Sequence, residues 1–289
     1  MLVAIWVITF CLIIGIGVYA GSSIKAASQW SGGDRTLGAW SLGCVFAAWQ
    51  IGGMAIVGAA QNGYNLGISG AWYSIAGSFY FIFLAFFAKL IRENLPSESV
   101  PEYLQLKFGQ KTARLYSYAW IVYGFLYIPI QLKTVSSIVQ IVLPGLSVSW
   151  AMLIGVTIAV VYTSFSGMRG ASAVGRVVCI GTYILLMAFV FTTLPKFGNY
   201  SGLLAKLPAQ YASWHNMPTH RIIAWVVGGC ISTAVMQSVL QPLLSAKSPE
   251  AARTGSILGY VIAAPICVLT AICGMFSKAS GADLGNGTT

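Results

Sequence analysis

The chain alternates between long apolar runs and short polar connections. A helix needs about 20 mostly apolar residues to cross the hydrocarbon core of a bilayer. By that criterion the pattern predicts an all-α polytopic membrane protein, with residues 1–289 forming one transmembrane domain of about eight spans. The expected spans are 2–20, 39–66, 71–91, 115–143, 148–165, 175–195, 220–245 and 254–277.

Composition strengthens this interpretation. Hydrophobic residues make up 57% of the chain and charged residues 8%, whereas soluble domains carry about 25% charged residues. The first run lacks a basic start and exceeds the apolar part of a signal peptide, about 7–15 residues, so we interpret it as a span. The six cysteines lie scattered in apolar runs without a C-x-x-C pair, which indicates small buried side chains instead of a metal site.

The basic residues predict the orientation of the chain. The net charge is +10, and the lysines and arginines lie mostly in short connections. That distribution indicates membrane topology and no nucleic-acid partner. With the N-terminus outside, 11 basic residues lie in inner connections and four in outer ones. The positive-inside rule therefore predicts a multi-pass protein of the cell membrane with an outer N-terminus.

The second span carries polar and flexible residues at bilayer depth. "AAWQIGGMAIVGAAQNGYNLG", residues 47–67, contains Gln50 beside Gly52 and Gly53. Glycine lowers helix stability by about 1 kcal/mol relative to alanine, so we expect a break here. Breaks at this depth line a cavity or contact protein, and transporters bind ions with the freed carbonyls. The alternative is close packing of neighbouring helices against Gly52, Gly58 and Gly63.

Lys133 is the only charged residue that lies well inside an expected span. It is about 16 Å from Pro144 along a helix that rises 1.5 Å per residue, and intramembrane ionisable residues usually have a function. Lys133 shares a helix face with Ser137 and Gln140. We expect its ammonium to contact a solute carboxylate or to fill the place of a cation. The alternative is bonding to carbonyls of a broken neighbouring helix.

The seventh span carries a polar stripe at four-residue steps, formed by Thr233, Gln237, Gln241 and Ser245. It predicts a hydrated pathway or, alternatively, polar contacts between helices. Pro242 is expected to break this helix near its inner end. No expected span holds an aspartate or glutamate, and no catalytic set of residues is present. An enzyme is therefore not expected.

Two connections carry local signals. "SVPEYLQLKFG", residues 99–109, predicts a short amphipathic helix with Ser99 as its N-cap and Pro101 in its first turn. "GYNLGISG", residues 63–70, is expected in an outer loop. No strand precedes it, so it does not match a phosphate-binding loop.

Five segments, in order along the chain, resemble the motifs of one transporter family. They are "SGGDRTLG" (31–38), the glycine-rich second span, "SVPEYLQLKFG", "YTSFSGMRGASAV" (162–174) and "QPLLSAKSPEAARTGSILG" (241–259). Each lies in the matching span or connection, and together they cover most of the chain. The chain thus resembles the sodium:solute symporters.

This resemblance implies a leucine-transporter-type inverted-repeat fold, with the first five-helix repeat complete and the second partial. It implies Na⁺ as the coupling ion, held by the backbone carbonyls of Ala48 and Ile51, with no organic cofactor. A small organic solute would bind beside the broken helix and the seventh span. From the resemblance and the polar positions, the expected substrate-binding residues are Gln50, Gly52, Gly53, Met54, Ala55, Lys133, Ser232, Thr233 and Gln237.

The chain departs from the family pattern at three points. The family's T-D-x-x-Q reads V-G-R-V-V at 174–178, so the aspartate that helps to bind a second cation in some relatives is absent. Proline follows Gln241 where arginine is usual. In the family, hydroxyls of a ninth helix complete the Na⁺ site. The chain ends after the eighth expected span, so we expect a partner chain to supply these hydroxyls.

Three interpretations remain open. The first is a truncated symporter that couples Na⁺ to a small solute, for which Lys133 favours a carboxylate, and that does not transport alone. The second is a membrane fragment or subunit that needs a partner chain to supply the missing C-terminal helices. The third is a Na⁺-independent permease of the same fold, with Lys133 in place of the ion.

Overall fold

The structure is a computed structural model, and it describes residues 2–22, 24–25, 30, 35–95, 99–233 and 235–281. The start of the "SGGDRTLG" segment and residues 282–289 lie outside this part. The described chain is helical, with one isolated parallel bridge between Leu37 and Ala246. Its long helices are α1 (Leu2–Gly21), α3 (Ala39–Gln50), α4 (Gly53–Leu66), α6 (Tyr80–Asn94), α8 (Gln110–Val142), α9 (Val148–Thr193), α11 (Thr219–Thr233) and α13 (Pro249–Ala279). Shorter elements are η2 (Gly67–Ala71), α5 (Trp72–Ser78), α7 (Val100–Phe108), η3 (Leu194–Phe197), α10 (Asn199–Ala205), η4 (Ala209–Ala212) and α12 (Gln237–Leu244).

Six helical runs in the described residues are long and apolar enough to cross a membrane, or seven if α11 and α12 count as one bent span. The eight spans expected from the sequence have other boundaries than these runs. α3 has only 12 residues, too few to cross alone, and Ala55–Asn94 counts as one run of 40 residues. This run folds back at Gly67, where φ is 72°, and the Ser74 hydroxyl donates to the Ala55 carbonyl at 3.2 Å.

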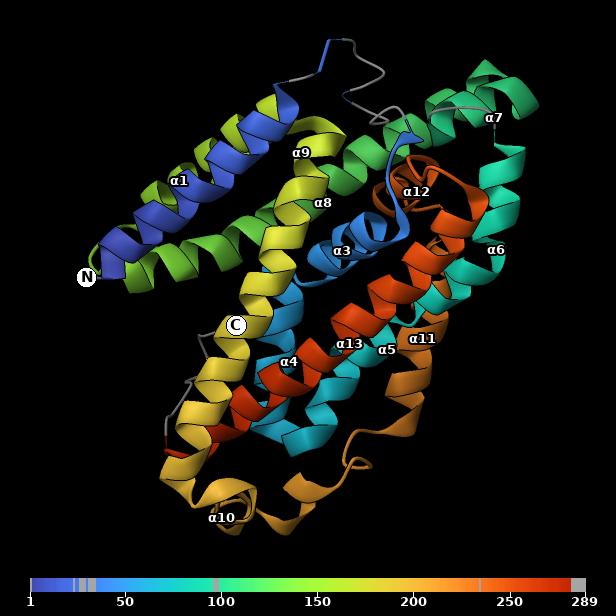
Figure 1. The fold of residues 1–289 in the computed structure, drawn as a ribbon. Helices are drawn as coiled ribbons and strands as arrows, with labels where there is room; N and C mark the ends of the chain where they lie inside the picture. The colour runs from blue at the N-terminus through green and yellow to red at the C-terminus, as the bar shows by residue number, and fades with distance from the viewer. Residues whose placement is uncertain are drawn as a thin grey trace.

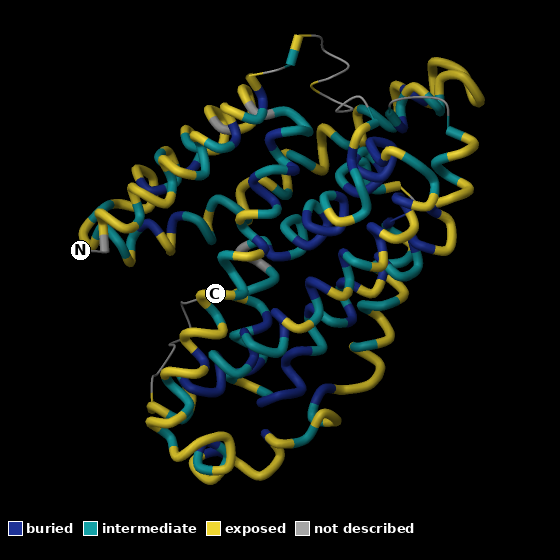
Figure 2. Tube along the Cα trace, viewed as in Figure 1, coloured by how far each residue is buried: buried dark blue, intermediate teal, exposed yellow. Residues whose placement is uncertain are grey.

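α13 lies at the centre of the assembly and packs against α3, α4 and α6 (Figure 1). Its glycines allow this close approach, because Gly255 lies against Leu42, Gly259 against Phe46, and Gly274 against the α4 backbone. Small residues commonly line such contacts between membrane helices. Figure 2 shows buried residues gathered around α13, whereas α1 and α8 are mostly exposed or intermediate.

The fifth and sixth expected spans, 148–165 and 175–195, match two separate runs that are long and apolar enough to cross a membrane, Val148–Phe165 and Gly167–Phe197. Only the connection between them is shorter than expected, because α9 consists of two helices that meet at a kink at Gly167, where φ is 52° and ψ is −163°. Glycine adopts this positive φ without a steric penalty. The polar residues of the "YTSFSGMRGASAV" segment are therefore helical, because serine, alanine and glycine are compatible with a membrane helix.

The amphipathic helix predicted in the inner connection is confirmed as α7. Ser99 is its N-cap, and its hydroxyl oxygen accepts a hydrogen bond from the Glu102 N–H at 3.4 Å. Pro101 lies in the first turn, where its missing N–H breaks no helical bond. Capping and proline placement are local signals, so the sequence predicts this helix well.

The glycine-rich outer segment is not a loop. α4 continues to Leu66, and all five residues of η2 are buried. Tyr211 of η4 covers Gly67 and donates its hydroxyl to the carbonyls of Tyr64 and Asn65, at 2.9 and 3.0 Å. The reversal between α4 and α5 is thus packed inside the protein.

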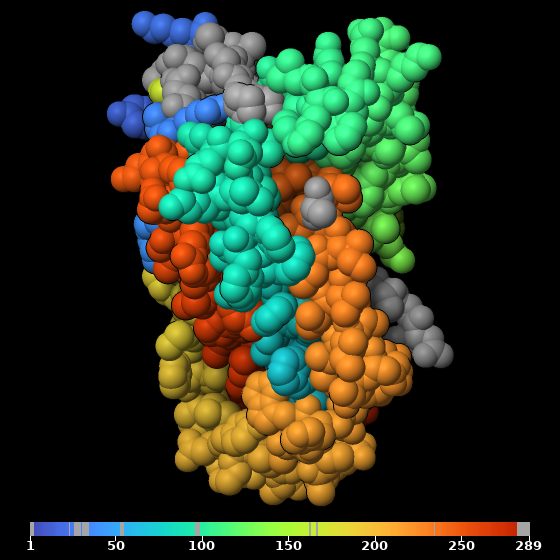
Figure 3. Space-filling view, turned by 90° about the vertical axis from the view of Figure 1, so that its right-hand side faces the viewer, coloured from blue at the N-terminus to red at the C-terminus, as the bar shows by residue number. Residues whose placement is uncertain are grey.

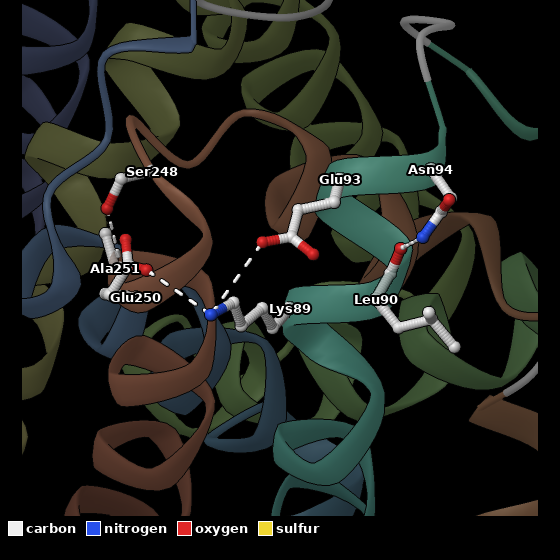
Figure 4. A network of polar contacts seen from close by, with 7 residues as sticks. All are labelled: Lys89, Leu90, Glu93, Asn94, Ser248, Glu250 and Ala251. Atoms are coloured by element: carbon white, nitrogen blue, oxygen red, sulfur yellow. Dashed lines mark hydrogen bonds and ion pairs between the residues drawn. The ribbon is translucent and has the colours of Figure 1, made fainter.

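Figure 4 shows how the end of α6 meets the start of α13. The Lys89 ammonium lies 3.9 Å from a carboxylate oxygen of Glu93 and 3.9 Å from one of Glu250. The Ser248 hydroxyl caps α13 by accepting a hydrogen bond from the Ala251 N–H at 3.1 Å. One lysine thus links the polar ends of two membrane helices.

Removal of this lysine's charge should change stability only slightly. The Lys89 side chain is 56% exposed, and exposed ion pairs contribute about 0–1 kcal/mol. Lys89→Gln should therefore lower the thermal unfolding temperature of the detergent-solubilised chain by no more than about 4 °C. Ser248→Ala should cost about 1 kcal/mol, because it removes a helix cap. If the Lys89→Gln variant failed to fold, the ion pairs of Lys89 would contribute more to stability than an exposed contact can.

Candidate functional site

The predicted break in the second expected span is confirmed between α3 and α4. The Ile51 N–H still donates to the Ala47 carbonyl at 2.8 Å, but Gly52, with ψ 159°, turns the chain out of the helix. The Ala55 N–H then donates to the Gly52 carbonyl at 2.9 Å and starts the next helix. Because a helix leaves its last carbonyls without intrahelical partners, the end of α3 offers oxygen ligands.

The close-packing alternative holds for other glycines of the same segment. A Cβ atom on Gly58 would overlap the Tyr73 ring, and one on Gly63 would overlap the backbone of Ala271. A Cβ atom on Gly52 would meet its nearest neighbour at 3.6 Å, an ordinary contact. Gly52 therefore belongs to the break, whereas Gly58 and Gly63 serve helix packing.

A second broken helix is formed by α11 and α12, whose axes differ by 57°. The Val235 carbonyl, inside this break, accepts hydrogen bonds from the Tyr116 hydroxyl at 2.7 Å and the Trp120 indole N–H at 3.1 Å. The prediction of one continuous polar stripe is therefore wrong, because Thr233 and Gln237 lie on different helices. Pro242 does not make the break either, since α12 continues past it to Leu244.

The residues of the expected stripe bond mostly to their own helices. The Thr233 hydroxyl donates to the Gly229 carbonyl at 2.8 Å, and the Ser245 hydroxyl donates to the Gln241 carbonyl at 3.0 Å. The Gln237 amide donates to the Gln241 side-chain oxygen at 2.6 Å. The buried Oε1 of Gln237 has no partner within the described residues, so it can accept a hydrogen bond from water or a ligand.

A cavity of about 300 Å³ lies between the two broken helices, a size within the usual range for small-molecule sites. Four of the predicted substrate-binding residues line it: Gln50, Gly52, Ala55 and Ser232. Only the backbone of Gly53 and Met54 is described. Thr233 borders a different, apolar hollow, and Gln237 is not in the cavity wall.

Aromatic rings form much of the cavity wall. They are Trp49, Tyr73, Tyr80, Tyr127 and Trp225. Trp49 meets Tyr80 edge to face with ring centroids 6.2 Å apart, and Tyr73 meets Trp225 in the same way at 5.2 Å. These rings interlock α3, α5, α6 and α11 and give the cavity a rigid apolar surface.

The polar part of the wall consists of amide and hydroxyl groups. The Tyr80 hydroxyl donates to the Gln50 side-chain oxygen at 3.3 Å. The Gln131 amide donates to the Tyr127 hydroxyl at 2.5 Å. Ser74 and Ser232 add two further hydroxyls. None of the described residues that line the cavity carries a charge.

Lys133 does not reach this cavity. It is exposed on α8, two residues after Gln131, and two positions in a helix of 3.6 residues per turn lie about 200° apart. Gln131 therefore points inward and Lys133 outward. Gln140, which was expected to share a polar face with Lys133, instead bonds locally: its side-chain amide donates to the Leu146 carbonyl at 2.9 Å. The structure gives no support for contact between Lys133 and a solute in this cavity.

One of the two predicted ion ligands, Ile51, borders a second, smaller cavity that adjoins the solute cavity at Gln50, Ala55 and Ser74, whereas Ala48 is not among its lining residues. This cavity of about 10 Å³ is also lined by the hydroxyl-bearing residues Ser74 and Thr270, and it has about the space that one water molecule needs. The described residues contain no cluster of three or more histidine, cysteine or acidic side chains. Carbonyl and hydroxyl oxygens are therefore what this region can offer a cation. The role of the Ala48 and Ile51 carbonyls stays a prediction.

The first broken helix is also held from outside. The Arg176 guanidinium on α9 donates to the Ser41 hydroxyl of α3 at 2.7 Å, and the Cys179 thiol donates to the Cys44 carbonyl at 3.3 Å. A Cβ atom on Gly175 would lie 3.4 Å from the same carbonyl oxygen. The V-G-R-V-V segment that replaces the family's T-D-x-x-Q is thus the point where α9 crosses α3.

Most of the aromatic wall could not be predicted from the sequence. Tyr127 and Gln131 lie at i and i+4, a spacing that places both on one helix face. Aromatic residues are common in membrane helices, however, and no local signal separates those that line a cavity from those that face lipid. Their role follows from the helices that surround them.

Two broken helices enclose an uncharged cavity within a bundle whose helices are long and apolar enough to cross a membrane, an arrangement that is typical of membrane transporters. The sequence profile of the sodium:solute symporter family matches residues 31–284. The chain belongs to the sodium:solute symporter family.

Individual relatives agree with this assignment. Sodium/glucose cotransporter 4 of Danio rerio is 25% identical over 319 residues, which cover 96% of this chain and 46% of that protein. A solved structure of a Na⁺-coupled sialic acid symporter, in a substrate-bound outward-open state, matches with a TM-score of 0.73 and 14% identity. It covers 96% of this chain and 60% of that one, and the likeness shows the expected leucine-transporter-type fold. The chain spans about half the length of its curated relative.

Proposed function

We propose that this chain forms the solute- and ion-binding half of a Na⁺-coupled symporter that works by alternating access. The observation that carries the proposal is the cavity between the two broken helices, with Gln50 and Ser232 in its wall. Broken helices at such a site leave backbone groups free for ion and solute. Na⁺, as cargo, would bind the carbonyls of Ala48 and Ile51, with further oxygen ligands from elsewhere in the complete transporter.

We propose an uncharged, hydroxyl-rich solute. Burial of an unpaired charge is costly, and no described residue of the wall supplies a counter-charge. Amides and hydroxyls can each donate and accept hydrogen bonds, as a hydroxyl-rich solute requires. A sodium/glucose cotransporter among the relatives is consistent with this class. The carboxylate suggested by Lys133 loses its support, because that side chain lies outside the cavity.

Tryptophan fluorescence provides the test. Trp49 and Trp225 line the cavity, so a bound solute should change the emission of the purified chain. D-glucose, sialic acid and choline represent neutral, anionic and cationic candidates. We expect D-glucose to bind at least about tenfold more tightly than the other two, which equals about 1.4 kcal/mol. Replacement of KCl by NaCl should tighten binding, since ion and solute affinities are linked reciprocally.

A matched pair of variants assigns the signal. Trp225→Phe should remove much of the emission change, whereas Trp40→Phe, at a residue that is 54% exposed, should keep it. Tightest binding of sialic acid would instead support a carboxylate-bearing solute. Equal binding in KCl and NaCl would support the Na⁺-independent permease.

A further inference from the structure

A second hollow, separate from the solute cavity, lies between α6, α7 and the second broken helix. Its volume is about 350 Å³, and its walls are almost entirely apolar, with Phe83, Phe87 and Ile91 from α6, Leu104 from α7 and Leu240 from α12. We call it the α6–α7 groove. Figure 3 shows this side of the molecule, where α6 in teal runs beside α11 and α12 in orange, with α7 in green above them.

The groove faces the region that acyl chains occupy. α6 is part of a run that is long and apolar enough to cross a membrane. Phe87 and Leu90 line the groove and are 44% and 59% exposed, and the adjacent Phe86 is 75% exposed. Apolar side chains exposed on a membrane helix contact lipid tails, because the bilayer core contains no water. A lipid tail is therefore the first molecule to reach the groove.

The end of the groove beside α7 is basic. Tyr103 lines it, and the Lys107 ammonium lies 5.8 Å from the centre of the Tyr103 ring. Residues 89–118, from the end of α6 to the start of α8, contain five basic side chains against three acids, a net charge of +2. The basic residues are Lys89, Arg92, Lys107, Lys111 and Arg114, and the acids are Glu93, Glu98 and Glu102. Basic residues next to a membrane helix attract anionic headgroups. In the predicted orientation this end lies at the cytoplasmic leaflet, where anionic lipids concentrate.

We propose that the α6–α7 groove binds one anionic phospholipid. Its acyl chain lies along α6, and its phosphate pairs with Lys107 at the α7 end. The tail then contacts Thr233 and Leu240, which stand on either side of the break in the second broken helix. Bilayer composition thereby acts on the helix that also lines the solute cavity. This proposal does not depend on which solute the cavity binds.

Native mass spectrometry of the purified full chain tests the groove, with phosphatidylglycerol and phosphatidylcholine as probes. We expect one retained phosphatidylglycerol per chain and about fivefold less phosphatidylcholine, the factor that about 1 kcal/mol per basic contact implies. Lys107→Gln should abolish this preference. Lys196→Gln, a charge-matched change at the exposed η3, should keep it. Equal retention of both lipids by the unmodified chain would overturn the proposal.

A matched pair of variants on α7 tests whether the acyl chain of the lipid lies in the groove. Leu104→Trp fills the groove and should lower retention of both lipids severalfold, whereas Leu106→Trp, at a residue that is 70% exposed and outside the groove, should not. If Leu104→Trp fails to fold, photo-crosslinking of the unmodified chain with an acyl-diazirine phosphatidylglycerol decides the matter. Adducts on Phe87, Leu90 or Leu104 are expected. Adducts spread over α1 and α8 instead, or a tightly bound protein in the groove, would overturn the proposal.

Discussion

Gly274→Ala should destabilise the chain more than any other single methyl group added to its core. The new Cβ would overlap the Ala60 carbonyl oxygen and crowd the Tyr64 backbone nitrogen. Both belong to the α4 backbone, which cannot move aside as a flexible side chain can. Overpacking of this kind costs about 3 kcal/mol, so the thermal unfolding temperature in detergent should fall by roughly 10 °C.

Gly181→Ala is the matched control for this change. Gly181 also lies inside a long membrane helix, but a Cβ there would meet nothing within 4 Å. Alanine has the higher helix propensity, so this variant should unfold at the same temperature as the unmodified chain or slightly above it. If both variants behaved alike, α13 would not cross α4 at Gly274, and the central position of α13 would be wrong.

Gln50→Leu should weaken solute binding by about tenfold or more. Gln50 lies at the end of α3, at the first break, and its side-chain oxygen accepts the Tyr80 hydroxyl. Leucine has nearly the same size but neither donates nor accepts. The loss leaves a solute hydroxyl and the Tyr80 hydroxyl unpaired inside the cavity, at about 1–3 kcal/mol for a buried unsatisfied group. The change in tryptophan emission on titration with D-glucose in NaCl measures it.

Two further variants show whether the effect belongs to the cavity. Tyr80→Phe keeps the ring and removes only the hydroxyl that Gln50 accepts, so it should cause a smaller loss of affinity than Gln50→Leu. Gln105→Leu makes the same substitution at an exposed position of α7 and should leave binding unchanged. If the Gln50→Leu variant bound the solute with full affinity, the solute would not bind at the first broken helix.

Local sequence signals located several elements well. The glycines beside Gln50 predicted the break between α3 and α4, because helix propensity depends on neighbouring residues only. Ser99 and Pro101 predicted the start of α7 for the same reason. The second break was predicted at the wrong place. Proline disfavours a helix interior, so the break was expected at Pro242, but α12 continues through this residue. The contacts that hold the true break come from Tyr116 and Trp120, more than 100 residues away.

The sequence by itself determined that this protein lies in a membrane, that its second expected span is broken, and that it resembles the family to which it belongs. These properties depend on composition and on short motifs. The tertiary structure alone decided which side chains share the cavity: the Tyr73 and Trp225 pair enters its wall, and Lys133 turns away two residues after Gln131. The reason is geometric, because the inner face of a helix is set by the helices packed around it, and here the glycines of α13 fix how closely they pack.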